Sequence, residues 1–176
     1  MQIPVLGTVT KDERFGWLYS DPVALRIFGN KPVRIVLEGY EEDQNKEDFH
    51  AAISKFLATG PEVLMAAQVD VFSFYSDINQ YYEPADEDFV HIDAEREVWK
   101  HVRFGDEAVV GRRAYGDKGI YVSVECNCDW EPEHGMQIVF KNGETICKVG
   151  PYDGHLTNAD AYADELLENV VYRSLG

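Results

Sequence analysis

The spacing of apolar residues changes period twice along this chain, and this restricts the possible folds more than any other feature. In the first forty residues, and again from residue 98, apolar residues recur at every second position, as on a half-buried strand. Between residues 49 and 82 they recur at intervals of three and four, as on one face of a helix. The sequence therefore predicts a single α+β domain over residues 1–176, with helices between two groups of strands.

The N-terminal part of the chain has the pattern of an antiparallel β-meander. Apolar residues alternate over 15–19, 23–28 and 33–37, and a Gly-Asn-Lys-Pro turn at 29–32 separates the last two segments. Short strands with turn residues between them favour sequential antiparallel pairing.

Two central helices follow in the predicted order. The first presents an apolar face and ends at Thr59-Gly60-Pro61, where glycine suits a C-cap and proline can open the next helix. The apolar face of this helix consists of Phe49, Ala52, Ile53, Phe56 and Leu57. A second helix is expected from Pro61 to Tyr82. Residues 83–97 are acidic and interrupted by Pro84, so they predict a loop, a short irregular helix or a mobile flap.

Strand patterns return at 98–104, 108–112 and 120–128. In the last of these, Val122, Val124 and Cys126 share one face, while Ser123 and Glu125 share the other. The three segments predict a C-terminal antiparallel sheet.

Asn142-Gly143 is the strongest local signal, because this dipeptide favours the two-residue type I′ turn of a β-hairpin. A turn there pairs Ile138 with Cys147 and puts Gly135 opposite Gly150. After the hairpin, Thr157 or Asn158 can cap a short C-terminal helix that extends to Leu167.

The charge balance is strongly acidic, with 16 basic and 32 acidic residues and a net charge of −16. This charge disfavours nucleic acids and anionic membranes as partners and would attract a basic protein. Six acidic residues are candidates for a partner-facing patch, with solvated loops as the alternative: Glu41, Glu42, Asp43, Asp86, Glu87 and Asp88. The basic pair Arg112-Arg113 is expected to meet the protein's own excess acids.

The sequence contains no apolar run of about 20 residues and no recognisable signal peptide, so a cytoplasmic location is expected. Cys126, Cys128 and Cys147 are an odd number of cysteines, which favours free thiols in a reducing compartment. The spacing of Cys126 and Cys128 fits neither a redox pair nor a zinc knuckle. We therefore expect buried thiols without a metal, and no cofactor.

The residues that could carry chemistry lie at the two ends of the predicted hairpin. Glu133 and His134 precede one strand, and Asp153 and His155 follow the other, so the register predicts one polar corner. Its composition is that of a metal or acid–base site, although the spacing matches no ligand template. The alternative is a structural turn held by side-chain hydrogen bonds.

The segment from Tyr121 to His155 resembles a family of uncharacterised bacterial domains with the signature C-x-C-x-W-[DE]-x-E-H-G. Here this reads Cys126-Asn-Cys-Asp-Trp130-Glu-Pro-Glu-His-Gly135. Ile3 to Gly7 and Gly16-Trp17 are similar to the opening of the same family. Some small acidic domains of this kind are similar to immunity proteins of bacterial toxin systems, which implies binding of a basic partner and no catalytic residues. Two functions remain open: a protein-binding domain, or a small enzyme or metal-binding protein centred on His134 and His155.

Overall fold

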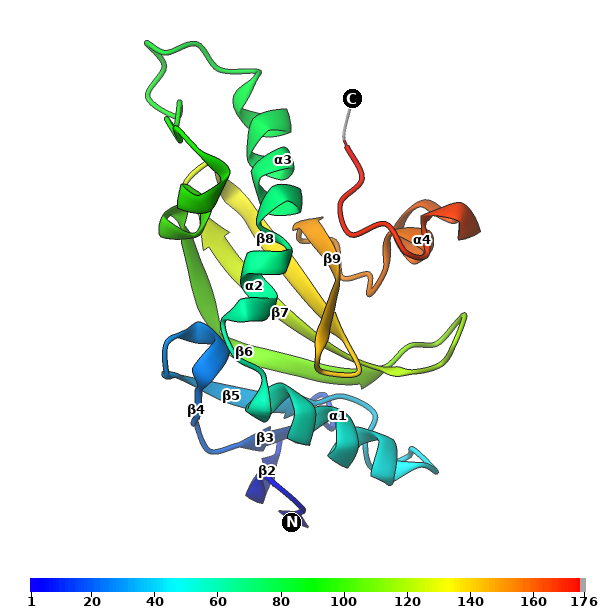
Figure 1. Cartoon of the computed structure of the whole chain (residues 1–176). Helices are drawn as coiled ribbons and strands as arrows, with labels where there is room; N and C mark the ends of the chain where they lie inside the picture. The colour runs from blue at the N-terminus through cyan, green and yellow to red at the C-terminus, as the bar shows by residue number, and fades with distance from the viewer. Residues whose placement is uncertain (175–176) are drawn as a thin grey trace.

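The computed structural model describes residues 1–174 and has the predicted α+β fold (Figure 1). In the described chain, nine strands form one sheet in the order β1-β2-β3-β5-β6-β7-β8-β9, and β4 pairs separately with β5. The strands are β1 (Gln2–Ile3), β2 (Gly7–Lys11), β3 (Leu18–Ser20), β4 (Val23–Leu25), β5 (Lys31–Leu37), β6 (Val102–Arg112), β7 (Ile120–Cys128), β8 (Glu131–Lys141) and β9 (Thr145–Pro151). The N-terminal antiparallel strands were expected, but their pairing is not sequential: β3 pairs with β5, and β4 pairs only with β5. The strand expected over 23–28 ends at Leu25, because residues 26–28 form a 3₁₀ helix, η1 (Arg26–Phe28).

The central helices lie on one side of the sheet (Figure 1). They are α1 (Lys46–Ala58), α2 (Glu62–Ala66) and α3 (Gln68–Asn79). The first matches the expectation, with Phe49, Ile53 and Phe56 buried. The second was expected to be continuous and is instead broken at Ala67, whose backbone leaves the α-region at φ −96° and ψ 5°.

The two halves of the sheet meet through a parallel pair that the sequence did not predict. β5 runs parallel to β6, with Ile35 opposite Ala108 and Leu37 opposite Val110. Parallel neighbours need a long crossover, and residues 38–101, which include all three central helices, form it. The helices therefore cover the sheet because they lie on the connection between its two central strands.

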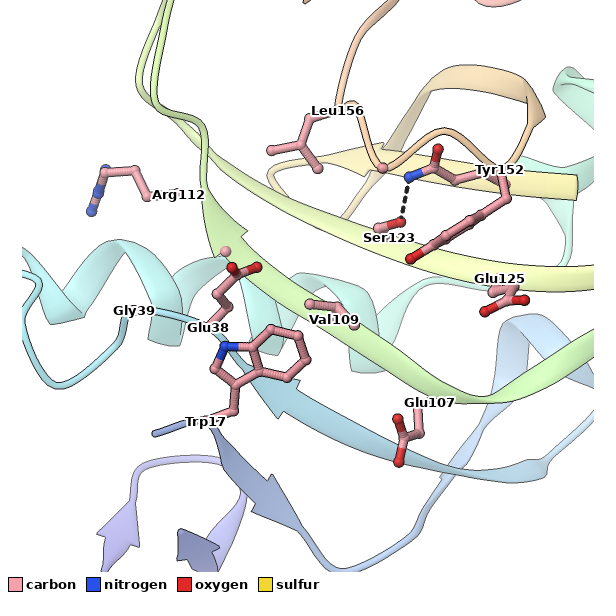
Figure 2. Close-up of a pocket in the computed structure, with 13 residues that line it drawn as sticks. Trp17, Glu38, Gly39, Glu107, Val109, Arg112, Ser123, Glu125, Tyr152 and Leu156 are labelled. Atoms are coloured by element: carbon pink, nitrogen blue, oxygen red, sulfur yellow. Dashed lines mark hydrogen bonds between the residues drawn. The ribbon is translucent and has the colours of Figure 1, made fainter. Parts of the chain in front are cut away.

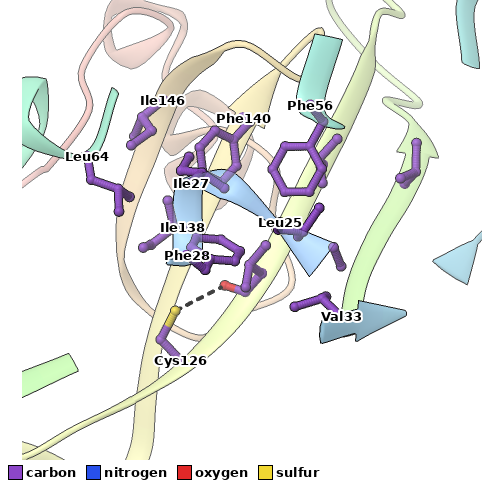
Figure 3. Close-up of a cluster of buried hydrophobic side chains, with 14 of the residues drawn as sticks. Leu25, Ile27, Phe28, Val33, Phe56, Leu64, Cys126, Ile138, Phe140 and Ile146 are labelled. Atoms are coloured by element: carbon purple, nitrogen blue, oxygen red, sulfur yellow. Dashed lines mark hydrogen bonds between the residues drawn. The ribbon is translucent and has the colours of Figure 1, made fainter. Parts of the chain in front are cut away.

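The core lies between the sheet and these helices (Figure 3). Leu25 and Val33 from the N-terminal strands are fully buried beside Ile138 and Phe140 of β8. Phe56 of α1 packs edge-on against Phe140, with ring centroids 5.1 Å apart. The two predicted groups of strands thus share one core.

The hairpin turn lies at the predicted residues, but the pairing register of β8 with β9 differs from the predicted one. Asn142 and Gly143 both have positive φ, as a type I′ turn requires, and the amide of Glu144 donates to the carbonyl of Lys141 at 3.2 Å. However, Lys141 pairs with Thr145, so the loop has three residues rather than two, and an irregularity between Val139 and Phe140 shifts the register by one more residue. Ile138 therefore pairs with Val149 rather than with Cys147. This register puts Ile146 opposite Phe140, where both side chains are buried in the core.

Two further boundaries differ from expectation. Residues 95–101 form a 3₁₀ helix, η2 (Glu95–His101), so the strand expected from Val98 begins only at Val102. The C-terminal helix is capped as expected by Thr157, which accepts from the amide of Asp160 at 3.1 Å. It ends early, as α4 (Asn158–Tyr162) followed by η3 (Glu165–Leu167).

Within the described part of the chain, no helix is long and apolar enough to cross a bilayer.

Candidate functional site

A pocket of about 570 Å³ opens on the face of the sheet opposite the helices (Figure 2). Its floor is formed by outward-facing residues of β6, β7 and β8, among them Val109, Ser123 and Gln137. Trp17, just before β3, forms one wall, and Tyr152 and Leu156, just after β9, form the other. The volume is within the range of small-molecule and side-chain binding pockets.

Three carboxylates line this pocket: Glu38 after β5, Glu107 on β6 and Glu125 on β7. All three residues are exposed, and in residues 1–174 no cation forms an ion pair with any of them. Arg112 also lines the pocket, but Asp43 and Asp48 bind its guanidinium at 2.6 and 2.9 Å. The pocket therefore presents unpaired negative charge between two aromatic side chains, an arrangement suited to a cation.

A chain of buried polar groups lies beneath the floor. The side chain of Lys148 is only 2% exposed and donates to the carboxylate of Asp153 and to the carbonyl of His155. It also donates to Oε1 of Gln137, whose Nε2 donates to Ser123 Oγ at 2.8 Å. Burial lowers the pKa of Lys148, and the hydrogen bond to Asp153 opposes that effect. The pocket floor is thus connected to a buried charge.

The wall beyond β9 continues into a C-terminal segment, residues 157–174, that a buried arginine fastens to the sheet. Arg113 is 3% exposed and forms paired hydrogen bonds with both Asp160 and Glu168, at 2.5 to 2.8 Å. The hydrogen bonds that Arg113 donates to Glu168, and then those to Asp160, raise the pKa of Arg113. As expected, both arginines at the end of β6 meet the protein's own acids.

The structure does not join the expected polar corner into one cluster. His134 is exposed and lies 3.1 Å from Glu131, and Glu133 is also exposed. Asp153 instead binds Lys148 and lies 3.4 Å from the ring of His155. Within residues 1–174 no hydrogen bond joins the two pairs. The last pair of β8 and β9 is Met136 with Pro151, and beyond it the chain turns back, so that Asp153 and the carbonyl of His155 bind Lys148 instead.

The six acidic candidates differ in their surroundings. Asp43 is largely buried against Arg112, which lowers the pKa of its carboxyl group, and Glu41 lies 2.5 Å from Lys11. Glu42 is exposed. Asp86, Glu87 and Asp88 are exposed on the loop between α3 and η2.

The three cysteines are free thiols; Cys126 and Cys128 are fully buried and Cys147 is half-buried. Burial raises the pKa of Cys128 and of Cys147 to about 12. In the described residues no group of three or more histidine, cysteine or carboxylate side chains is arranged to hold a metal ion.

Residues 5–156 match the model of a family described as a domain of unknown function, DUF6985. The chain belongs to this family. The expectation of an uncharacterised domain family is thereby confirmed. No curated protein and no solved structure matches the chain. Every residue that lines the pocket, from Trp17 to Leu156, lies inside the DUF6985 region, whereas the Arg113-bound segment, residues 157–174, lies outside it.

The pocket residues were not singled out from the sequence as a site. They come from segments far apart in the chain, and the parallel pairing of β5 with β6 brings Glu38 beside β6. One signal was available: Ser123 and Glu125 share the polar face of a strand whose other face is entirely apolar. A polar stripe in the centre of a sheet implies either solvent or a ligand.

Proposed function

We propose that this domain binds a basic protein partner, and that a lysine or arginine side chain of the partner enters the pocket between Trp17 and Tyr152. The observation that carries the proposal is the convergence of three unpaired carboxylates, Glu38, Glu107 and Glu125, on an aromatic-walled pocket. Carboxylates supply charge and hydrogen-bond acceptors for the cation, and the aromatic faces supply cation–π attraction.

The net charge of −16 supports the same function at longer range. An acidic surface increases the rate at which a basic partner arrives, and the pocket then provides the specific contact. In its most specific form, the proposal is an immunity-type protein that masks a basic toxin in the bacterial cytoplasm.

The experiment compares two variants with the same change in charge. In the pocket variant, Glu38→Gln, Glu107→Gln and Glu125→Gln are combined. In the control variant, Asp86→Asn, Glu87→Gln and Asp88→Asn neutralise three exposed acids on the loop after α3. Binding of a short peptide of alternating glycine and arginine is measured by calorimetry at low and at moderate salt.

The pocket variant is expected to bind the peptide about tenfold more weakly or worse. Partly exposed charge pairs contribute about 0.2–1 kcal/mol each, and tenfold corresponds to about 1.4 kcal/mol. The loop variant is expected to stay within about twofold of the wild type at moderate salt, where separated exposed charges are screened. Equal losses in both variants, or no binding by the wild type, would overturn the proposal.

A further inference from the structure

Lys148, Gln137 and Ser123 form the chain of polar groups under the pocket, and their chemistry fixes which group donates and which accepts in each hydrogen bond. Lysine has no acceptor when it is charged, so the atom of Gln137 that faces Lys148 must be the carbonyl oxygen. That contact is 3.4 Å long, and Lys148 also donates to Asp153 and to the carbonyl of His155. Because Gln137 is 1% exposed, its amide cannot exchange these partners for bulk water.

The orientation of Gln137 decides what Ser123 offers to the pocket. Nε2 of Gln137 donates to Ser123 Oγ at 2.8 Å, so the hydroxyl oxygen is the acceptor in this bond. The hydrogen of the hydroxyl group is then free to donate elsewhere, and in residues 1–174 it has no acceptor. Ser123 lies on the pocket floor between the two walls (Figure 2). The floor therefore presents a hydrogen-bond donor in a pocket whose unpaired charged groups, Glu38, Glu107 and Glu125, are acceptors.

We propose that the pocket recognises a cation together with a neighbouring hydrogen-bond acceptor, and that Ser123 donates to that acceptor. This inference rests on the proposed function and names the ligand class more closely. An arginine or lysine residue within a peptide chain carries a backbone carbonyl near its charged side chain. A simple alkylguanidine or polyamine has the charge and lacks the acceptor. Trp17 and Tyr152 also carry donors, but Tyr152 is half-exposed and neither is oriented by a buried charge.

The test uses two probes of equal charge. N-acetyl-arginine N-methylamide has the guanidinium and two carbonyl groups, whereas n-butylguanidine has the guanidinium alone. Dissociation constants for both are measured by NMR titration on the wild type, on Ser123→Ala and on Ser123→Thr. The readout is the ratio of the two constants in each protein.

In the wild type the amide probe is expected to bind more tightly than butylguanidine. Ser123→Ala should weaken only the amide probe, by about three- to tenfold, as expected for one hydrogen bond. Ser123→Thr, which keeps the hydroxyl group, should restore most of the difference. Unchanged butylguanidine binding by Ser123→Ala shows that the pocket is still folded.

Two outcomes separate this inference from the function on which it rests. If butylguanidine binds the wild type and Ser123→Ala leaves the ratio unchanged, the role of Ser123 is wrong while the cation pocket stands. If neither probe binds the wild type, the proposed function fails, and this inference fails with it.

Discussion

Alternate residues of β7 point into two different environments. On the helix side, Val122, Val124 and Cys126 belong to a core of apolar side chains. On the far side, which is the face of the sheet opposite the helices, Tyr121 is buried beside a charged group, Arg113. Ser123 and Glu125, on the same face, line the pocket. One face of the sheet is thus stabilised by apolar burial, and the other combines paired charges, which hold the C-terminal segment, with unpaired charges in the pocket.

The difference shows how charge is divided on the far side. Arg113 and Lys148 are buried and fully partnered, which is what the cost of burying a charge requires. Glu38, Glu107 and Glu125 are exposed and unpartnered in the described chain. The partnered charges fix the wall of the pocket, and the unpartnered ones are available to a ligand.

The largest effect is expected on the helix side. Phe56→Ala should lower the free energy of unfolding by about 3–5 kcal/mol, because it leaves a cavity between Phe28 and Phe140. Denaturant unfolding measures this. Tyr81→Ala, at a side chain that is 71% exposed, should change stability by about 0.5 kcal/mol or less. Similar losses in the two variants would contradict the assignment of the core to this face.

A smaller effect on stability is expected on the far side, where the ion pairs of Arg113 hold the C-terminal segment. Arg113→Met should lower the free energy of unfolding by about 2–3 kcal/mol. Breaking a fully buried ion pair costs roughly 3–5 kcal/mol, and the loss here is smaller because Asp160 and Glu168 are partly exposed. The loss should be local, so limited proteolysis should cut residues 157–174 first. The control is Arg112→Met, whose arginine is 26% exposed, with an expected cost of about 1 kcal/mol. If the segment stays protected in Arg113→Met, the arginine does not fasten it.

The smallest effect is expected for the pH dependence of stability, which is compared for a thiol on the helix side, Cys128, and one on the far side, Cys147. Cys128 and Cys147 both have a folded-state pKa of about 12, so between pH 9 and pH 12 only the unfolded chain releases these protons. Their contribution to stability is complete below pH 9 and declines above it. Between pH 8 and pH 10, the free energy of unfolding of the wild type should fall by about 1 kcal/mol more than that of Cys128→Ala or of Cys147→Ala. A loss seen only for Cys128 would show that the far side is less firmly closed.

The sequence predicted the helix side better than the far side. Periodicity and turn preference are local properties: the first located α1 and the apolar face of β7, and the second located the turn at Asn142-Gly143. It could not show that β5 pairs with β6, because that contact depends on a crossover of more than sixty residues, from 38 to 101. It also put Val98 in a strand, since a buried residue in a 3₁₀ turn has no distinctive period.

The far side was missed because its polar residues have partners that are distant in sequence or set by register. Lys148 carries a charge, yet it is buried, and its partners are Gln137 on the neighbouring strand and Asp153 after β9. The expected corner of Glu133 and His134 with His155 does not form, because Asp153 and the carbonyl of His155 turn back to bind Lys148. Whether any of these four candidates binds a ligand stays a prediction.

The central claim, that the far side of the sheet is the functional one, is tested most directly by locating a bound cation. Chemical shifts of the backbone and of the Gln137 side-chain amide are followed while N-acetyl-arginine N-methylamide is added to the wild type. The account predicts saturable shifts concentrated in residues 107–111, 123–125 and 152–156 and at the Gln137 amide. Shifts confined to residues 83–95, or spread evenly over the acidic surface, would contradict it.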